Sequence, residues 1–424
     1  LLKDLPLTYE LNNDVLILYR LTPKPIPWLI TGRIMEAGTH ELLPFSHVTI
    51  NGQGSTTDFR GTFSHSTLTD SVFRVIISHL GCYRLDTILY PGIDQTILLH
   101  PAIVGLPEIV VNDRRIEKSA QIGALPGLLT INPYIAQYLP GNGDNSVFNL
   151  LRLQPGILAA GEQTNDLIIW GCSEGTSRLK MDGFSIWKLN NLSDQIGAIN
   201  PYLLKNIRVM KGGYDASIDD VTGGIADITA INGNTRNIGF NLFVNNQTIN
   251  GMAEIPIMEK SSLVMAFRQT YQNLFSASNF KSNRLLNPDS GNQSYTISPN
   301  YVFRDLNLKY SVPFNNGGLF YLSALASNDH LHYRYKQEWP LFKLFSNNHE
   351  TNTQLATSVH YGKNGKNGNR TDFKSAYSVL AGSINRERFI ERNRNNKRVN
   401  RVDAHAEQSV AEWTGEVEHQ VQIR

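Results

Sequence analysis

The residues that could do chemistry in this chain form no familiar catalytic set. The 424 residues contain no His-Glu-x-x-His motif, no Gly-x-Ser-x-Gly motif and no phosphate-binding loop. The two cysteines, Cys82 and Cys172, make neither a disulfide framework nor a zinc site. We therefore expect a protein that is not an enzyme and that carries no cofactor and no metal centre.

Two polar clusters could bind a ligand, and each has a plainer interpretation. The sequence Gly-Asn-Gly-Asp-Asn at 141–145 could form a calcium-like turn, but an ordinary Asx/Gly loop has the same composition. His330 and His332, with Tyr333 and Tyr335, could bind a metal chelate or haem. The same residues could instead form an aromatic girdle at the end of a strand.

A run of basic residues lies near the end of the chain. Its members are Arg386, Arg388, Arg392, Arg394, Lys397, Arg398 and Arg401. Only Phe389 interleaves with them, so the aromatic platform of a nucleic-acid site is missing, and a net charge of +2 gives no reason to expect such a partner. We predict a solvated extracellular loop that could meet lipopolysaccharide or an anionic ligand.

The elements in the first hundred residues are all β. Runs 7–11 and 15–19 predict a hairpin, and the proline-rich stretch 22–27 predicts a linker. Short runs rich in β-branched residues follow at the spacing of a β-sandwich. They are 29–34, 47–50, 61–64, 72–77 and 87–89.

Residues 101–234 mix helical and strand patterns. Residues 147–153 have helical spacing and stop at Gln154-Pro155-Gly156, where proline cannot continue a helix. Strands are expected at 167–169 and 207–210. A second short helix is expected from Asp194 to Leu204.

From residue 235 onward, several segments alternate between apolar and polar residues. Ile238, Phe240, Leu242 and Val244 face away from Asn237, Asn241 and Asn245. A second segment places Val302, Leu306, Leu308 and Tyr310 on the face opposite Asp305, Asn307 and Lys309. A third segment places Ala411, Trp413, Val417, Val421 and Ile423 on the face opposite Glu412, Glu416, Glu418, Gln420 and Gln422. Such strands are typical of a transmembrane β-barrel or of a soluble sandwich. No apolar run reaches the roughly 18 residues of a spanning helix, which excludes a helical membrane protein.

The order of motifs between 140 and 232 favours the barrel. Five motifs follow one another there: Gln154-Pro-Gly156, Ile168-Ile-Trp-Gly171, Lys180-Met-Asp-Gly-Phe184, Ile207-Arg-Val-Met-Lys-Gly-Gly213 and Val221-Thr-Gly-Gly-Ile-Ala-Asp-Ile228. This order resembles the plug domain of TonB-dependent outer-membrane receptors, which fills the lumen of their barrel. Trp170 stands where the family usually has arginine, which puts a plug-to-wall ion pair there in doubt.

The resemblance implies a set of structural or gating residues in the plug, namely Gly171, Asp182, Gly183, Lys211, Gly212, Gly223 and Gly224. Asp182-Gly183 suits a tight turn because glycine tolerates positive φ. The glycines around 212 and 223 would let a plug strand press against the barrel wall. Asp182 and Lys211 could alternatively be ligand contacts.

The flanking segments resemble other parts of such receptors. Residues 28–100 resemble the carboxypeptidase-regulatory-like β-sandwich of Bacteroidetes-type receptors, and 1–21 resemble the tail of a short secretin/TonB N-terminal domain. The fold class implied is mostly β: sandwich, α/β plug at 112–232, and antiparallel strands of an incomplete transmembrane barrel at 235–424. Residues 106–111 resemble the strand leading into the plug, near which the TonB box is often found.

The function that the resemblance implies is uptake of a scarce large solute across the outer membrane. The solute would be a siderophore, haem, vitamin or oligosaccharide, with energy supplied by TonB and its inner-membrane complex. Outer-membrane lipid, a surface lipoprotein and an anti-sigma regulator are further expected partners, and the N-terminal domains would be periplasmic. A cell-surface carbohydrate-binding or adhesion protein built of sandwiches is the alternative. Because the chain starts at Leu1 and ends within an alternating run, we expect it to be a piece of a longer polypeptide.

Overall fold

The computed structural model describes most of the chain. The described residues are 7–12, 15–20, 28–92, 94–102, 120–122, 127–133, 144, 146–159, 166–191, 196–214, 218, 221–258, 260–271, 282–285, 294–314, 317–365, 369–394 and 398–421. The predicted linker at 22–27, the strand at 106–111 and all of the 141–145 loop except Asp144 lie outside them.

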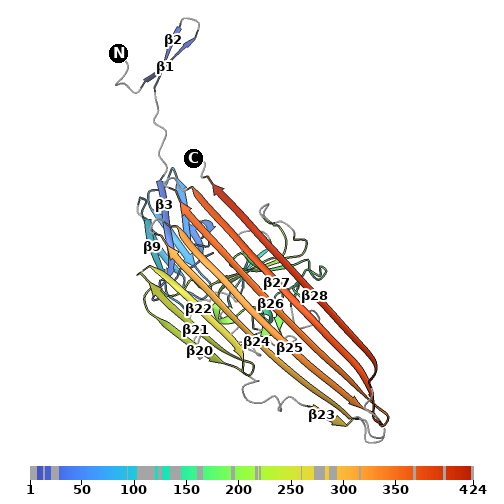
Figure 1. The fold of residues 1–424 in the computed structure, drawn as a ribbon. Coiled ribbons are helices and arrows are strands. Elements are labelled where there is room, and N and C mark those ends of the chain that lie inside the picture. Colours follow the sequence, from blue (N-terminus) through green and yellow to red (C-terminus); the bar gives the residue numbers. More distant parts are fainter. Residues whose placement is uncertain are drawn as a thin grey trace.

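The N-terminal part contains a hairpin and a two-sheet sandwich (Figure 1). The hairpin pairs β1 (Leu7–Asn12) with β2 (Val15–Arg20), as predicted. The sandwich consists of β3 (Trp28–Glu36), β4 (His47–Ile50), β5 (Gln53–Thr56), β6 (Thr62–Thr67), β7 (Phe73–Ser78), β8 (Leu85–Leu89) and β9 (Asp94–Leu99). The sheets β6-β3-β9 and β5-β4-β7-β8 enclose one apolar core, and each predicted strand of the sandwich is present.

A central domain, residues 120–232, follows. It contains β10 (Ala120–Ile122), β11 (Leu128–Ile131), α1 (Ser146–Arg152), β12 (Ile157–Leu158), β13 (Ile168–Ile169), β14 (Arg178–Met181), β15 (Phe184–Ile186), β16 (Asn190–Asn191), β17 (Ile196–Gly197), η2 (Pro201–Leu203), β18 (Leu204–Met210) and β19 (Ile225–Ala230). Six of these strands form one sheet in the order β10-β11-β18-β19-β14-β15. Helix α1 ends before Pro155, as predicted.

The predicted helix from Asp194 to Leu204 is wrong. Strand β17 and the single 3₁₀ turn η2 occupy its described part, from residue 196 onward. The Asn200 side chain caps the turn by accepting a bond from the Tyr202 amide at 3.1 Å, and Pro201 stands in the first turn, where its missing N–H costs nothing. Leu204 then returns to extended backbone and enters β18. Pairing in the sheet has overridden the local helical spacing.

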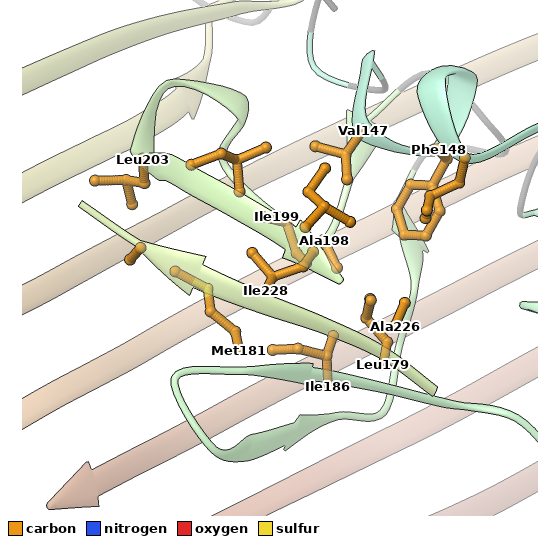
Figure 2. Close-up of a cluster of buried hydrophobic side chains, with 14 of the residues drawn as sticks. Val147, Phe148, Leu179, Met181, Ile186, Ala198, Ile199, Leu203, Ala226 and Ile228 are labelled. Atoms are coloured by element: carbon orange, nitrogen blue, oxygen red, sulfur yellow. The ribbon is translucent and has the colours of Figure 1, made fainter. Parts of the chain in front are cut away.

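The core of the central domain is apolar and is built between α1 and its six-stranded sheet. Figure 2 shows Val147 and Phe148 of α1 facing Ile199, Ile228 and their neighbours. The strands that pass behind them belong to the long C-terminal sheet, residues 239–420. Phe148 and Ile228 are fully buried. The same apolar cluster includes six residues of the sheet formed by residues 239–420, so the core of the central domain continues into that sheet: Met252, Val264, Ala266, Leu325, Ala356 and Ala376.

A long antiparallel sheet completes the fold (Figure 1). Its strands are β20 (Gly239–Val244), β21 (Thr248–Ile257), β22 (Ser261–Thr270), β23 (Ser282–Leu285), β24 (Ser294–Pro313), β25 (Leu319–Glu338), β26 (Phe342–Asn364), β27 (Arg370–Arg392) and β28 (Arg398–Gln420). They pair in sequence order, with β23 added beside β24. The chain is mostly β, as predicted. Among the described residues no helix is long and apolar enough to cross a membrane.

In the long sheet the apolar face is exposed and the polar face is buried, which is the reverse of a sheet in a water-soluble protein. On β20, Phe240 is 70% exposed, and on β28, Trp413 is 73% exposed. On β24, Asp305 and Lys309 are only 2% and 3% exposed, whereas Leu306 between them is 38% exposed. We call the apolar, exposed face the outer face and the polar face, which contacts the central domain, the inner face. The predicted alternation is confirmed on these strands.

Candidate functional site

The candidate site is the interface between the central domain and the inner face of the long sheet. Asp182, in the tight β14–β15 turn, has φ of 47° and is followed by Gly183 with φ of 98°. Its Oδ1 accepts a bond from Lys309 Nζ at 2.9 Å, and its Oδ2 accepts one from Ser323 Oγ at 2.9 Å. The Tyr321 hydroxyl donates to the Asp182 carbonyl at 3.3 Å. One turn of the central domain is thus held by three side chains of two strands.

Lys309 is shared between two elements of the central domain. Besides Asp182, its Nζ donates to the carbonyl of Ala230 at 2.8 Å, and the amide of Ala230 donates to Asp182 Oδ1 at 3.1 Å. The side chain of Asp182 is fully buried and that of Lys309 is 4% exposed. A buried charge that loses its partner costs about 3–5 kcal/mol, so this pair fixes the position of the turn.

A second anchor is a buried triad of charges. Arg268 on β22 donates to Asp305 on β24 at 2.6 Å and to Asp144 of the central domain at 3.3 Å, and all three side chains are fully buried. Asp144 also accepts bonds from Thr248 Oγ1 at 2.6 Å and Asn245 Nδ2 at 3.0 Å. The carboxylate of Asp144 is therefore surrounded by donors of the sheet.

Two further anchors lie beyond the Asp182 turn. Lys188 Nζ lies 2.7 Å from Asp329 Oδ1, and Gln354 Oε1 accepts the backbone amides of Trp187 and Lys188 at 3.0 and 3.1 Å. Arg178 and Ser185 both bond to Glu412 of β28.

The chemistry of these contacts differs from that of the apolar core in Figure 2. Carboxylates, ammonium and guanidinium groups, hydroxyls and amides make them, and each of these groups bonds well to water once it is exposed. These polar contacts can be exchanged for water one at a time, whereas the apolar cluster also crosses the interface through Met252, Val264 and Leu325.

The other residues that the resemblance singled out lie inside the central domain. Lys211 donates to the Pro155 carbonyl and lies 5.3 Å from the Trp170 ring, and burial lowers the pKa of its ammonium. Gly171 and Gly212 have φ of 69° and 149°, with open space where a side chain would start.

The expected approach of the paired glycines to the wall is wrong. A Cβ on Gly223 would lie 2.5 Å from Ser177 Oγ, and one on Gly224 would lie 2.3 Å from Ile169 Cδ1. Both neighbours belong to the central domain. These glycines allow β19 to begin against β13 and β14, where the parallel β14–β19 pairing leaves no room for a side chain.

Residues of the predicted histidine cluster and of the basic run contact other residues of the long sheet. His332 stacks on His349 of the next strand with ring centroids 3.9 Å apart, and the described part of the chain has no group of three or more His, Cys, Asp or Glu that could hold a metal ion. The basic run is not the loop we expected, since β27 extends to Arg392 and β28 begins at Arg398. Arg398 pairs with Glu391 at 3.4 Å, and Arg401 pairs with Glu387 at 3.3 Å. Strand pairing brings these opposite charges together.

Sequence reasoning missed several anchors. Arg268, Lys188 and Asp329 were not singled out, Asp144 was seen only as part of the 141–145 turn, and Lys309 and Glu412 were seen only as polar positions of an alternating strand. A full charge on the polar side of an alternating run was the available signal, because a charge that faces a protein interior needs a partner.

No protein-family model matches the chain, and no curated protein matches it. Among solved structures it is similar to the ferric citrate transporter FecA, with 11% identity and a TM-score of 0.34 over 65% of this chain and 51% of that one. It is also similar to FpvA of P. aeruginosa bound to pyoverdines (10%, TM-score 0.38, 71% and 50%) and to the outer membrane transporter YddB of Escherichia coli (10%, TM-score 0.36, 72% and 56%). The chain spans about half the length of these structures.

Proposed function

We propose that the chain is the N-terminal part of a TonB-dependent outer-membrane receptor that imports a scarce large solute. The observation that carries the proposal is the exposure of the two faces of the long sheet: apolar side chains cover its outer face, and charged side chains are buried on its inner face against the central domain. A water-soluble sandwich would bury the face that is exposed here. In a bilayer the same face meets lipid, and the polar face lines a lumen.

The outer face also fits the thickness of a membrane. Apolar residues cluster on the part of each strand nearest the sandwich, with Leu355, Tyr361, Tyr377, Trp413 and Val417 between 42% and 73% exposed. We call this part the apolar band. Farther along, polar outer positions face one another, such as Thr351 opposite Ser383 and, on the next pair, Ser383 opposite Glu407. Strand β26 has 23 residues, and about 10 suffice to cross a bilayer, so the remainder would project from the membrane.

The central domain would be the plug of this lumen. Many of its anchors are polar groups that bond well to water once they are exposed, which would let part of the plug move. TonB would supply the energy, and the solute would be a siderophore, haem, vitamin or oligosaccharide. A surface lipoprotein or an anti-sigma regulator would be a further partner.

The sandwich would lie on the periplasmic side. It packs against the sheet at the strand ends joined by residues 314–318 and 365–369, where Arg33 donates to the Phe314 carbonyl at 2.8 Å and Asp58 lies 3.5 Å from Arg370. This side follows from the resemblance of residues 28–100 to the sandwich that precedes the plug in such receptors. The sandwich would be the carboxypeptidase-regulatory-like domain.

Membrane fractionation tests the proposal. The full-length protein, expressed with its own export signal, should sediment with the outer membrane and resist salt and carbonate extraction. It should then bind a purified periplasmic fragment of TonB in detergent. Recovery of a water-soluble protein from the medium would reject the transporter and favour the adhesion or carbohydrate-binding alternative.

A further inference from the structure

The sandwich contacts the central domain and the long sheet at once, through two loops. The first is the β3–β4 loop (37–46) and the second is the β5–β6 loop (57–61). We call them the docking loops. Together they join parts of the chain that are more than a hundred residues apart.

The first docking loop inserts a carboxylate into the central domain. Glu41 is 7% exposed; its Oε2 accepts a bond from Lys205 Nζ at 2.8 Å and its Oε1 accepts the amide of Asn232 at 2.8 Å. Lys205 on β18 is 4% exposed and also lies 3.3 Å from Glu36. Two carboxylates of the sandwich therefore neutralise a buried ammonium of the central domain.

Asn232 connects that contact to the long sheet. It lies where the chain leaves β19 for β20, and its own oxygen atoms accept bonds from Ser262 Oγ and from Ser311 Oγ, the latter at 3.3 Å. Glu41 thus bonds the segment that joins the central domain to the sheet. If the sandwich leaves, Lys205 and the Asn232 amide lose these partners together.

An aromatic contact reinforces the first loop. Phe45 has φ of 55°, a left-handed conformation that is uncommon for a bulky residue and that has to be held by surrounding contacts. Its ring lies 3.8 Å from the guanidinium carbon of Arg208, also on β18. Strand β18 is therefore contacted by the sandwich at two positions.

The second docking loop fixes the sandwich to the sheet. Asp58 accepts bonds from Arg60 and Thr62 within its own loop, which preforms it, and lies 3.5 Å from Arg370 of β27. Phe59 lies 4.0 Å from the ring of His360, and Thr62 lies 3.5 Å from the Asn364 amide.

We propose that the sandwich is an intramolecular latch, which holds the central domain in the sheet while its docking loops are seated. This inference rests on the proposed function, because a latch has a role only if the central domain is the plug of a transporter. Release of the sandwich exposes β18, leaves Lys205 without its carboxylates and frees the Asn232 segment. The latch then has to open before β11 and β18 can be remodelled.

Hydrogen exchange on the full-length protein in detergent tests the latch without solute or TonB. In Glu41→Gln, amides of β11 and β18, and the β19 amides that donate to β18, should exchange at least about tenfold faster than in the wild type, while those of β14 and β15 keep their rates. Arg74→Gln is the matched control, since it breaks an exposed sandwich ion pair with Asp86 far from either docking loop. Unchanged exchange of β18 in Glu41→Gln would overturn the proposal.

A covalent tether between sandwich and sheet distinguishes release of the sandwich from a local effect of losing the Glu41 charge. Thr62→Cys with Asn364→Cys, in a background without Cys82 and Cys172, places two thiols where a short bifunctional maleimide can join sandwich and sheet. With the tether closed, Glu41→Gln should return β18 to within about twofold of the wild-type rate. Fast exchange despite the tether, or failure of the two cysteines to cross-link, would refute the latch. Neither result bears on the fractionation experiment, so the two proposals fail separately.

Discussion

The ammonium of Lys309, on β24, lies 2.9 Å from the carboxylate of Asp182, in a turn of the central domain 127 residues earlier. Both side chains are buried. The pair joins the inner face of the long sheet to the domain it surrounds, and we expect the seating of that domain to depend on it.

Replacing one partner of this pair should loosen the central domain. Lys309→Met leaves the Asp182 carboxylate buried with only hydroxyl and amide donors, which should cost about 3–5 kcal/mol. The double variant Lys309→Met with Asp182→Asn should cost less than Lys309→Met alone, because no charge is left unpaired. Protease protection of the central domain in detergent measures both effects.

The exposed pair Lys374–Glu416, 2.9 Å apart and more than a third exposed on each side, is the control. Lys374→Gln should change protection by less than about 1 kcal/mol. A loss as large as that of Lys309→Met would show that burial of the Asp182 pair is not what matters.

The apolar band should tolerate no charge. Tyr377→Arg, in the band, should reduce insertion into lipid vesicles by an amount equivalent to about 2–4 kcal/mol, because a charge near the bilayer centre is costly. Thr351→Arg, on the outer face beyond the band, should insert like the wild type. Insertion is followed by the heat-dependent shift of the folded protein on gels, and equal behaviour of the two variants would contradict our placement of the membrane.

The close packing at Gly224 predicts a specific loss of stability. Gly224→Ala brings a methyl group to 2.3 Å from Ile169 Cδ1, so it should destabilise the central domain by about 1–3 kcal/mol. Adding Ile169→Ala should not restore that loss, because the remaining Cβ of residue 169 would lie 2.7 Å from the new methyl group and a fully buried side chain would be lost. Gly54→Ala, in an open part of the sandwich, is the neutral comparison. Thermal unfolding followed by tryptophan fluorescence measures the series, and a Gly224→Ala variant as stable as Gly54→Ala would contradict the close packing at Gly224.

His79 makes the seating of the sandwich sensitive to acid. Burial, with lesser effects of Lys205 and His47, lowers the pKa of His79 to about 3 in the folded protein. Its unfolded pKa is about 6.5. The folded state therefore resists protonation, and stability that is complete above pH 6.5 declines as the pH falls toward 3, at up to about 1.4 kcal/mol per pH unit.

Hydrogen exchange of β7 at pH 7.5 and pH 5, corrected for the intrinsic rate, measures this loss. His79→Asn, which can keep the bond to Ser46, should flatten the pH dependence. A variant that is as acid-sensitive as the wild type would assign the effect to another group.

Local sequence patterns were sufficient for the sandwich strands other than β5 and β9, for α1 and for the faces of the long sheet. In these segments burial follows the period of the residues, as when Asp305, Leu306 and Asn307 alternate between the inner and outer faces. The turn at Asp182-Gly183 was predictable too, because few residues other than glycine and asparagine or aspartate accept its backbone angles.

The partners of the charged residues were decided only by tertiary structure. Nothing near Lys309 in the sequence indicates Asp182, and nothing near Lys205 indicates Glu41, since each pair forms only when distant strands are brought together. The same holds for Gly224, whose neighbour is Ile169 and not the wall, and for residues 196–204, where sheet pairing replaced a helix. A periodic pattern fixes which face a side chain joins; the packing of whole domains decides what it meets there.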